Sequence, residues 1–173
     1  MVAELLVEEV DWEIERLKAD ACIKNHVIAA MGVALVPSFF IELSGVTGIE
    51  VSLIMDLANI YGFPIPNRLI AYKILLSLIL TLGPLYLIIR LRPAIKMVPV
   101  AGQAAYFGLV SFTNAATVYA IGKIFQLHFE SGGKLLSKDN SVLRRIFKQQ
   151  YENGKQRITE YKTERDLAAS QAT

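Results

Sequence analysis

Apolar residues recur every three or four positions near the start of the chain, and acidic residues fill most of the places between them. This spacing puts the apolar residues on one face of a helix over residues 3–21. Because the polar side is acidic, we expect this helix to pack on the domain or on a basic surface, for example the protein's own tail. The apolar positions are Ala3, Leu6, Val10, Ile14, Leu17 and Ala21.

A second amphipathic pattern begins after Ser141, a good N-cap, towards the other end of the chain. Its polar side is basic, so we expect it to contact anionic lipid or a partner protein. The pair Asn153-Gly154 is predicted to interrupt this helix. The basic residues are Arg144, Arg145 and Lys148.

Three long apolar runs lie between these ends. The first, His26 to Leu43, contains Pro37 and is slightly shorter than the roughly 20 residues that a spanning helix needs. We therefore predict a helix that enters a membrane, bends at the proline and stops.

Turn-forming residues at 44–48 separate this run from an amphipathic pattern over residues 49–61. Gly62 is predicted to end that second helix, and Pro64 and Pro66 prevent its continuation. We expect the helix to lie at an interface or against the membrane part and not to cross.

The second run is the strongest membrane signal in the chain. Sixteen uncharged residues lie between Lys73 and Arg90. Gly83-Pro84 falls inside this run and must kink the helix or break it into a hairpin.

The third run, Met97 to Gly122, has 26 residues and no charge. We predict a further bend at Pro99. Small residues then recur four apart, which allows helices to approach closely in lipid, although ordinary alanine packing explains them equally well. The candidate helix-packing residues are Ala101, Ala104, Ala105, Gly108, Ser111 and Ala115.

Charged residues are concentrated at the two ends. Residues 1–20 carry seven acids and two bases, residues 123–173 carry ten bases and six acids, and the 102 residues between them have six bases and three acids. That middle section cannot give every helix a polar face, so a membrane, or a neighbour in a larger assembly, must cover it. We predict an all-α protein: an acidic amphipathic helix (1–21), a domain of membrane-embedded bent or re-entrant helices (22–130), and a basic amphipathic tail (131–173).

The positions of the basic residues do not agree with any simple membrane topology. The connector bases Arg90, Arg92 and Lys96, which we expect to contact lipid or a partner, indicate a cytoplasmic side, and so does the tail after Lys123. A single crossing by the third run would separate them, whereas re-entrant pairs keep both on one side. We expect both termini to be cytoplasmic at a bacterial inner membrane, and the acidic start is not that of a signal peptide.

No catalytic motif appears, so we expect no enzyme, no cofactor site and no metal site. The stretch Glu130-Ser-Gly-Gly-Lys134 lacks the spacing of a phosphate loop. His26 and His128 do not form a helical zinc-binding pair, and the single Cys22 gives neither a disulfide framework nor a cysteine-based metal site. The net charge of +2 gives no reason to expect nucleic acid.

Three acids in or beside the apolar segments are the candidate polar site: Glu42, Glu50 and Asp56. Acids in such places are costly and often functional. They could bind a partner's cation or line a polar path. The alternative is that Glu42 caps the first run and the other two face lipid headgroups.

The stretch 37–62 reads P-x4-E-x4-T-x2-E-x6-L-A-x2-Y-G. This pattern resembles the YcjF-type family of bacterial membrane domains of unknown function, with Ser38-Phe39 in place of a second proline, Glu42 in place of Asp and Glu50 in place of Gln. VPVAG at 98–102 and NAAT…AIG at 114–122 resemble that family's second apolar part. Its members are often fused to, or encoded beside, Era-like GTPases, so the resemblance implies a stand-alone chain whose nucleotide chemistry is supplied in trans.

These features favour a membrane-embedded scaffold or adaptor that recruits a soluble partner, for which the resemblance suggests a GTPase. Two other hypotheses stay open at this stage. The small-residue spacing and the acids are also typical of a homo-oligomeric pore or transport component. A small structural subunit of a large membrane complex would have its apolar middle covered by a neighbour.

Overall fold

The computed structural model describes residues 2–33, 39–63, 65–95, 103–137 and 139–171. This part of the chain forms six α-helices and one short 3₁₀ turn and has no strand, which confirms the all-α prediction. In chain order they are α1 (Val2–Val33), α2 (Phe39–Ile60), α3 (Arg68–Leu82), α4 (Pro84–Ile95), α5 (Gln103–Glu130), η1 (Leu135–Ser137) and α6 (Asn140–Gln171).

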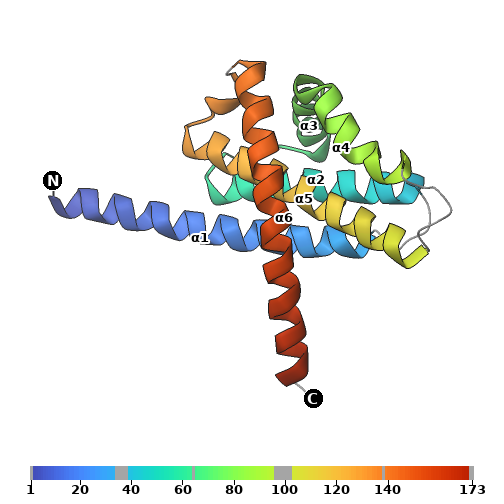
Figure 1. Cartoon of the computed structure of the whole chain (residues 1–173). Helices are drawn as coiled ribbons and strands as arrows, with labels where there is room; N and C mark the ends of the chain where they lie inside the picture. The colour runs from blue at the N-terminus through green and yellow to red at the C-terminus, as the bar shows by residue number, and fades with distance from the viewer. Residues whose placement is uncertain (1, 34–38, 64, 96–102, 138, 172–173) are drawn as a thin grey trace.

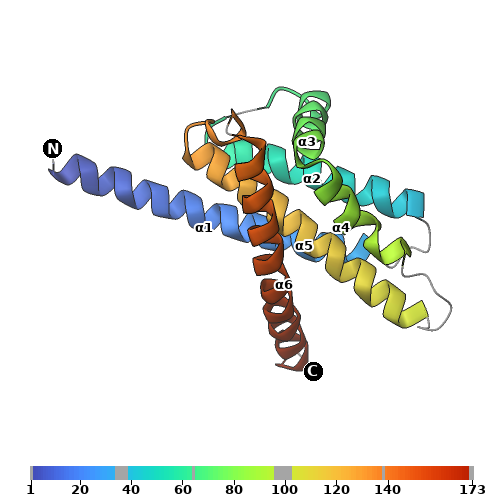
Figure 2. The same ribbon diagram turned by 45° about the horizontal axis from the view of Figure 1, so that its top comes forward.

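Helix α5 lies at the centre of the fold, with α1, α2, α4 and α6 packed around it (Figures 1 and 2). Its most extensive contacts are with α6 and then with α1. Every residue from 113 to 122 is buried, and ten consecutive residues cover the whole circumference of a helix. The third apolar run is therefore covered over this stretch by the protein's own helices, including the charged end helices, and does not face lipid there.

The two end helices are longer than their amphipathic patterns predicted. Helix α1 continues without a break past residue 21 as far as Val33, and its buried positions include Ile23 and Val27. Helix α6 likewise runs unbroken through Asn153-Gly154, so the predicted interruption is wrong. Gly154 is buried close to the ring of Tyr119, where a side chain would be crowded, so this glycine permits close packing of α6 on α5.

Ion pairs fasten α1 to its neighbours. Asp20 binds Lys123 of α5 at 2.6 Å, which agrees with an acidic helix packing on the basic part of the chain. Lys24 pairs with Glu164 of α6 in the opposite sense, the base coming from α1 and the acid from the tail. The acidic helix is thus tied to the protein's own α5 and to α6, which crosses it (Figure 1).

Helix α2 begins at Phe39, so the turn predicted at 44–48 is helical. Gly45 lies where α2 approaches α1, because a Cβ on it would stand 2.8 Å from the Val33 side chain. Its end agrees with the prediction: Gly62 has φ +70°, and the N–H of Phe63 donates back to the Ala58 carbonyl at 2.7 Å. Gly45 thus permits close packing of α2 on α1, and Gly62 ends the helix.

The longer α2 is the helix, among those described, that is long and apolar enough to cross a membrane, over Leu43–Ile60. Within that stretch 39% is buried in the protein. The prediction that residues 49–61 do not cross a membrane assumed a helix that begins at residue 49, whereas α2 begins ten residues earlier, at Phe39.

The second apolar run is broken at Gly83-Pro84, as predicted. Helices α3 and α4 meet there at 99°. Gly83 has φ +56°, and its N–H donates to the Ile79 carbonyl at 2.8 Å, while Pro84 opens α4 at the position where its missing N–H costs nothing. Neither α3 nor α4 alone is long enough to cross a membrane, so this run is a bent pair.

Two glycines of α5 give a matched test of the packing. We expect Gly122→Ala to lower the free energy of unfolding by about 1–2 kcal/mol, because its Cβ would stand 2.9 Å from buried Ile23 and 3.1 Å from Leu53. Gly108→Ala should raise it by about 0.5–1 kcal/mol, because that site is open and alanine favours helix. Denaturant unfolding in mild detergent measures both, and equal effects at the two sites would contradict the packing described.

Candidate functional site

Large apolar side chains are exposed along one side of α3 and on α4. On α3 these residues are spaced three or four apart, which places them on one side of the helix. Leu76 and Leu80 are 55% and 71% exposed. We call this the outer apolar face; it consists of Leu69, Tyr72, Leu76, Leu80, Leu87 and Ile88.

The opposite side of α3 is apolar as well. Ala71, Leu75, Leu78 and Leu82 are buried there, and α3 packs against α2 and α6. The polar residues Lys73, Ser77 and Thr81 form only a narrow strip between these two sides, so most of the circumference of α3 is apolar. A contiguous exposed apolar surface of this kind marks contact with a membrane or with another protein.

The bend between α3 and α4 is supported by Arg144 of α6. Its Nε donates to the Thr81 carbonyl at 3.0 Å, one of the carbonyls left free where α3 ends. Arg144 was predicted to contact lipid or a partner, and the structure gives it this internal role. Arg145 and Lys148, from the same prediction, are exposed.

A buried polar cluster joins α2, α4 and α5. Glu50 is fully buried, and the hydroxyl of Tyr86 on α4 donates to both of its carboxylate oxygens at 3.3 and 3.2 Å. One turn further along α4, Arg90 donates through Nη1 to Asn114 of α5. Its Nη2 is buried without a hydrogen-bond partner in the part of the chain that the structure describes.

This cluster changes the interpretation of two predicted sites. Glu50 points into the protein and does not face lipid headgroups. Arg90, predicted at a lipid or partner surface, turns its guanidinium inward, where its positive charge acts on Glu50. The Tyr86–Glu50 bonds join α4 to α2 and the Arg90–Asn114 bond joins α4 to α5, so the cluster favours one relative position of the three helices.

The other predicted residues are distributed over several places. Asp56 is exposed on α2, Ala115 is buried, and Gly108 is exposed with open space around it. The Ser111 hydroxyl donates to the Met31 carbonyl at 3.0 Å, which joins α5 to α1. Residues whose positions or side chains lie outside the described part are Pro37, Glu42, Arg92, Lys96, Pro99, Ala101, Ala104 and Ala105.

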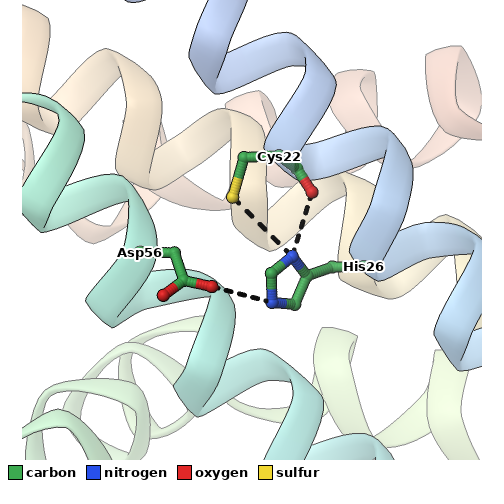
Figure 3. Close-up of side chains that lie close together, drawn as sticks. All are labelled: Cys22, His26 and Asp56. Atoms are coloured by element: carbon green, nitrogen blue, oxygen red, sulfur yellow. Dashed lines mark hydrogen bonds and ion pairs between the residues drawn. The ribbon is translucent and has the colours of Figure 1, made fainter.

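A second cluster, which the sequence did not predict, joins α1 and α2 (Figure 3). The ring of His26 lies between Asp56 and Cys22: its Nε2 is 3.3 Å from Asp56 Oδ2, and its Nδ1 is 3.7 Å from Cys22 Sγ. Nδ1 also lies 2.9 Å from the Cys22 carbonyl. A thiol, an imidazole and a carboxylate are all possible metal ligands.

The electrostatics of this cluster keep the thiol neutral as long as no cation is bound. Burial, and then the negative charge of Asp56, raise the pKa of Cys22 to about 11. The available sequence signal was the four-residue spacing of Cys22 and His26, which places both on one side of a helix. Asp56 comes from a different helix, so spacing along the chain could not identify it.

His128 closes the end of α5. Its Nδ1 accepts a hydrogen bond from the N–H of Leu136 in η1 at 3.2 Å. Burial lowers the pKa of this imidazole below its ordinary value. The neutral ring therefore holds the turn that leads from α5 to α6.

The chain is similar to magnetosome membrane protein 22 of Magnetospirillum gryphiswaldense. The two are 31% identical over 159 residues, which cover 88% of this chain and 78% of the relative. No family model matches the chain, and no solved structure matches it. The resemblance to the YcjF-type family therefore rests on its short motifs.

The buried cluster predicts that Tyr86→Phe is destabilising. The change removes the hydroxyl that donates to a fully buried carboxylate, so the free energy of unfolding should fall by about 1–3 kcal/mol. Tyr72→Phe, on the outer apolar face, is the matched control and should change it by less than about 0.5 kcal/mol. Chemical unfolding in one detergent compares the two, and equal stability of both variants would be inconsistent with the cluster.

His128 predicts a loss of stability on acidification. As the pH falls through the ordinary histidine pKa of about 6.5, the unfolded chain takes up a proton that the folded state resists, so the free energy of unfolding decreases. His128→Asn keeps an acceptor near Nδ1 but does not titrate, so the decrease between about pH 7.5 and about pH 5.5 should be smaller in the variant. All other titratable groups are the same in both proteins, so the difference in pH dependence reports on His128; identical pH dependence would contradict the assignment.

Proposed function

The chain belongs to the family of magnetosome membrane protein 22, and we propose that it is a membrane-embedded scaffold or adaptor that recruits a soluble protein partner. The relative is by name a membrane protein, which supports a membrane location for this chain. The place that we propose is the bacterial cytoplasmic membrane, with both ends of the chain on the cytoplasmic side.

The outer apolar face is the observation on which the proposal rests. Transfer of an exposed leucine side chain from water to lipid is favourable by about 25 cal/mol per Å² of apolar surface. At about 1.5 Å per residue, the 15 residues of α3 extend roughly 22 Å, less than a hydrocarbon core of about 30 Å. The bent pair α3–α4 therefore fits an element that enters a membrane without crossing it.

The charged ends of α1 and α6 are the proposed recruiting surface. The first half of α1 and the last part of α6 project from the helical body in different directions (Figure 1). Exposed charges on the described part of these helices include Glu13 on α1 and Arg145 and Lys148 on α6. Arg145 and Lys148 lie in the first turns of α6, before its projecting part, so the proposed surface includes the exposed side of α6 as well as the projecting ends.

A GTPase is the partner that we propose. The support is the resemblance to the YcjF-type family, whose members are often fused to or encoded beside Era-like GTPases. In this arrangement the soluble domain supplies the nucleotide chemistry and the present chain supplies the membrane anchor.

Membrane embedding is tested with two leucines that are equally exposed. Leu80 and Leu17 are both 71% exposed, the first on the outer apolar face and the second on α1. Leu80→Lys should lower the fraction that stays with membranes after alkali and high-salt washing, because a lysine in the hydrocarbon costs about 2.5–3.5 kcal/mol. Leu17→Lys should leave it unchanged. Release of the unaltered protein by alkali alone would mean that a neighbouring subunit, and not lipid, covers the face.

Recruitment is tested with substitutions on the exposed side of α6. Deleting the whole tail is not informative, because Leu143, Phe147 and Ile158 belong to the core. The double variant Arg145→Gln/Lys148→Gln should lose co-purification with an Era-like GTPase from the same bacterium. The control, Gln149→Glu/Gln156→Glu, changes the net charge by the same amount on the same helix; equal loss in both would indicate a general charge effect and no specific surface.

A further inference from the structure

We propose that Cys22, His26 and Asp56 bind a divalent metal ion of the zinc class, which bridges α1 and α2 (Figure 3). This inference is independent of the membrane role, because it rests only on the geometry of the three side chains. It also departs from the sequence-based expectation of no metal site, which considered sites built from several cysteines or from paired histidines.

The spacing of the donor atoms suits such an ion. In a tetrahedral site, bonds of about 2.0–2.3 Å place neighbouring donors roughly 3.3–3.7 Å apart. The separation between His26 Nε2 and Asp56 Oδ2 is 3.3 Å. One donor atom from each of the three residues lies within 4.8 Å of the other two, so binding of one ion by all three requires the Cys22 side chain to turn towards Nε2 and Asp56.

The hydrogen bond of the imidazole provides the second, independent argument. His26 Nδ1 lies 2.9 Å from the Cys22 carbonyl, so it is the nitrogen that carries the hydrogen and donates. In the neutral ring Nε2 then presents a lone pair towards a carboxylate oxygen, and two acceptors at this distance repel unless a cation lies between them. Metal-binding histidines typically donate their other ring N–H to a backbone carbonyl in this way.

The surroundings allow an ion to enter. The side chain of Asp56 is 51% exposed and that of His26 17% exposed, so the cluster opens to solvent on the Asp56 side. Three protein ligands leave one position of a tetrahedral ion free for water or for a further ligand. Thiolate, imidazole and carboxylate together favour Zn²⁺ or Co²⁺ over Mg²⁺ or Ca²⁺, which take oxygen ligands.

Cobalt gives the most direct test. The full-length protein in mild detergent, reduced and treated with a chelator, is titrated with Co²⁺. We expect one equivalent to bind, a thiolate-to-cobalt absorption band in the near ultraviolet, visible bands of tetrahedral intensity, and displacement of all of these by Zn²⁺. Cys22→Ser should lose the thiolate band, and His26→Gln and Asp56→Asn should each weaken binding at least about tenfold.

Two further variants keep the test decisive. Cys22→His retains a nitrogen donor one turn from His26, so it should bind cobalt without the thiolate band. Glu13→Gln removes an exposed carboxylate of α1 outside the cluster and should bind as the unaltered protein does. Zn²⁺ should raise the melting temperature of the unaltered protein and of Glu13→Gln, and not that of Cys22→Ser or Asp56→Asn.

The competing occupant of the space between His26 and Asp56 is a proton, which would make a simple ion pair. In that case no thiolate band forms even at about 1 mM Co²⁺, and the proposal is overturned. A site that binds Co²⁺ with a free energy of about 4 kcal/mol or more would be at least half occupied at that concentration. Unchanged cobalt affinity in Cys22→Ser would overturn it as well. Circular dichroism of each variant establishes that lost binding does not reflect lost helix.

Discussion

The burial of α5 is the constraint on which the rest of the structure depends. Its central ten residues are enclosed all round, so no single neighbouring helix can cover them. Helices α1 and α6, which have the charged exteriors, cover two sides and α2 and α4 cover the others. The chain thus uses its two most polar helices to cover the fully buried part of α5, while α3 and α4 present the outer apolar face.

The Glu50–Tyr86–Arg90–Asn114 cluster lies inside the same enclosure. Burying these polar groups carries a desolvation cost, which their hydrogen bonds offset. Because each hydrogen bond requires its donor and acceptor in place, the cluster stabilises the observed orientation of α2, α4 and α5 relative to orientations in which one of these helices is rotated. Apolar side chains alone would permit several packings of comparable energy, because methyl groups have little directional preference.

The sequence predicted features that depend on local chemistry. Helix class, the end of α2 at Gly62 and the break at Gly83-Pro84 follow from the backbone properties of glycine and proline, and they were found. The sequence did not predict what covers α5, because an apolar run has the same residue pattern whether lipid or protein surrounds it. The Cys22–His26–Asp56 cluster was missed for a related reason: two of its residues share a helix, but the third reaches them only through the packing of α1 on α2.

The arrangement around α5 also sets an order of events during synthesis. Helix α6 leaves the ribosome last of the six, yet its residues Leu143, Phe147 and Ile158 complete the core. Until they arrive, one side of α5 stays uncovered and is open to aggregation, as is common when contacts distant in sequence form late. Early delivery to a membrane or a chaperone protects such a nascent chain until α6 has been synthesised. The rate of translation therefore sets how long the uncovered side of α5 needs this protection.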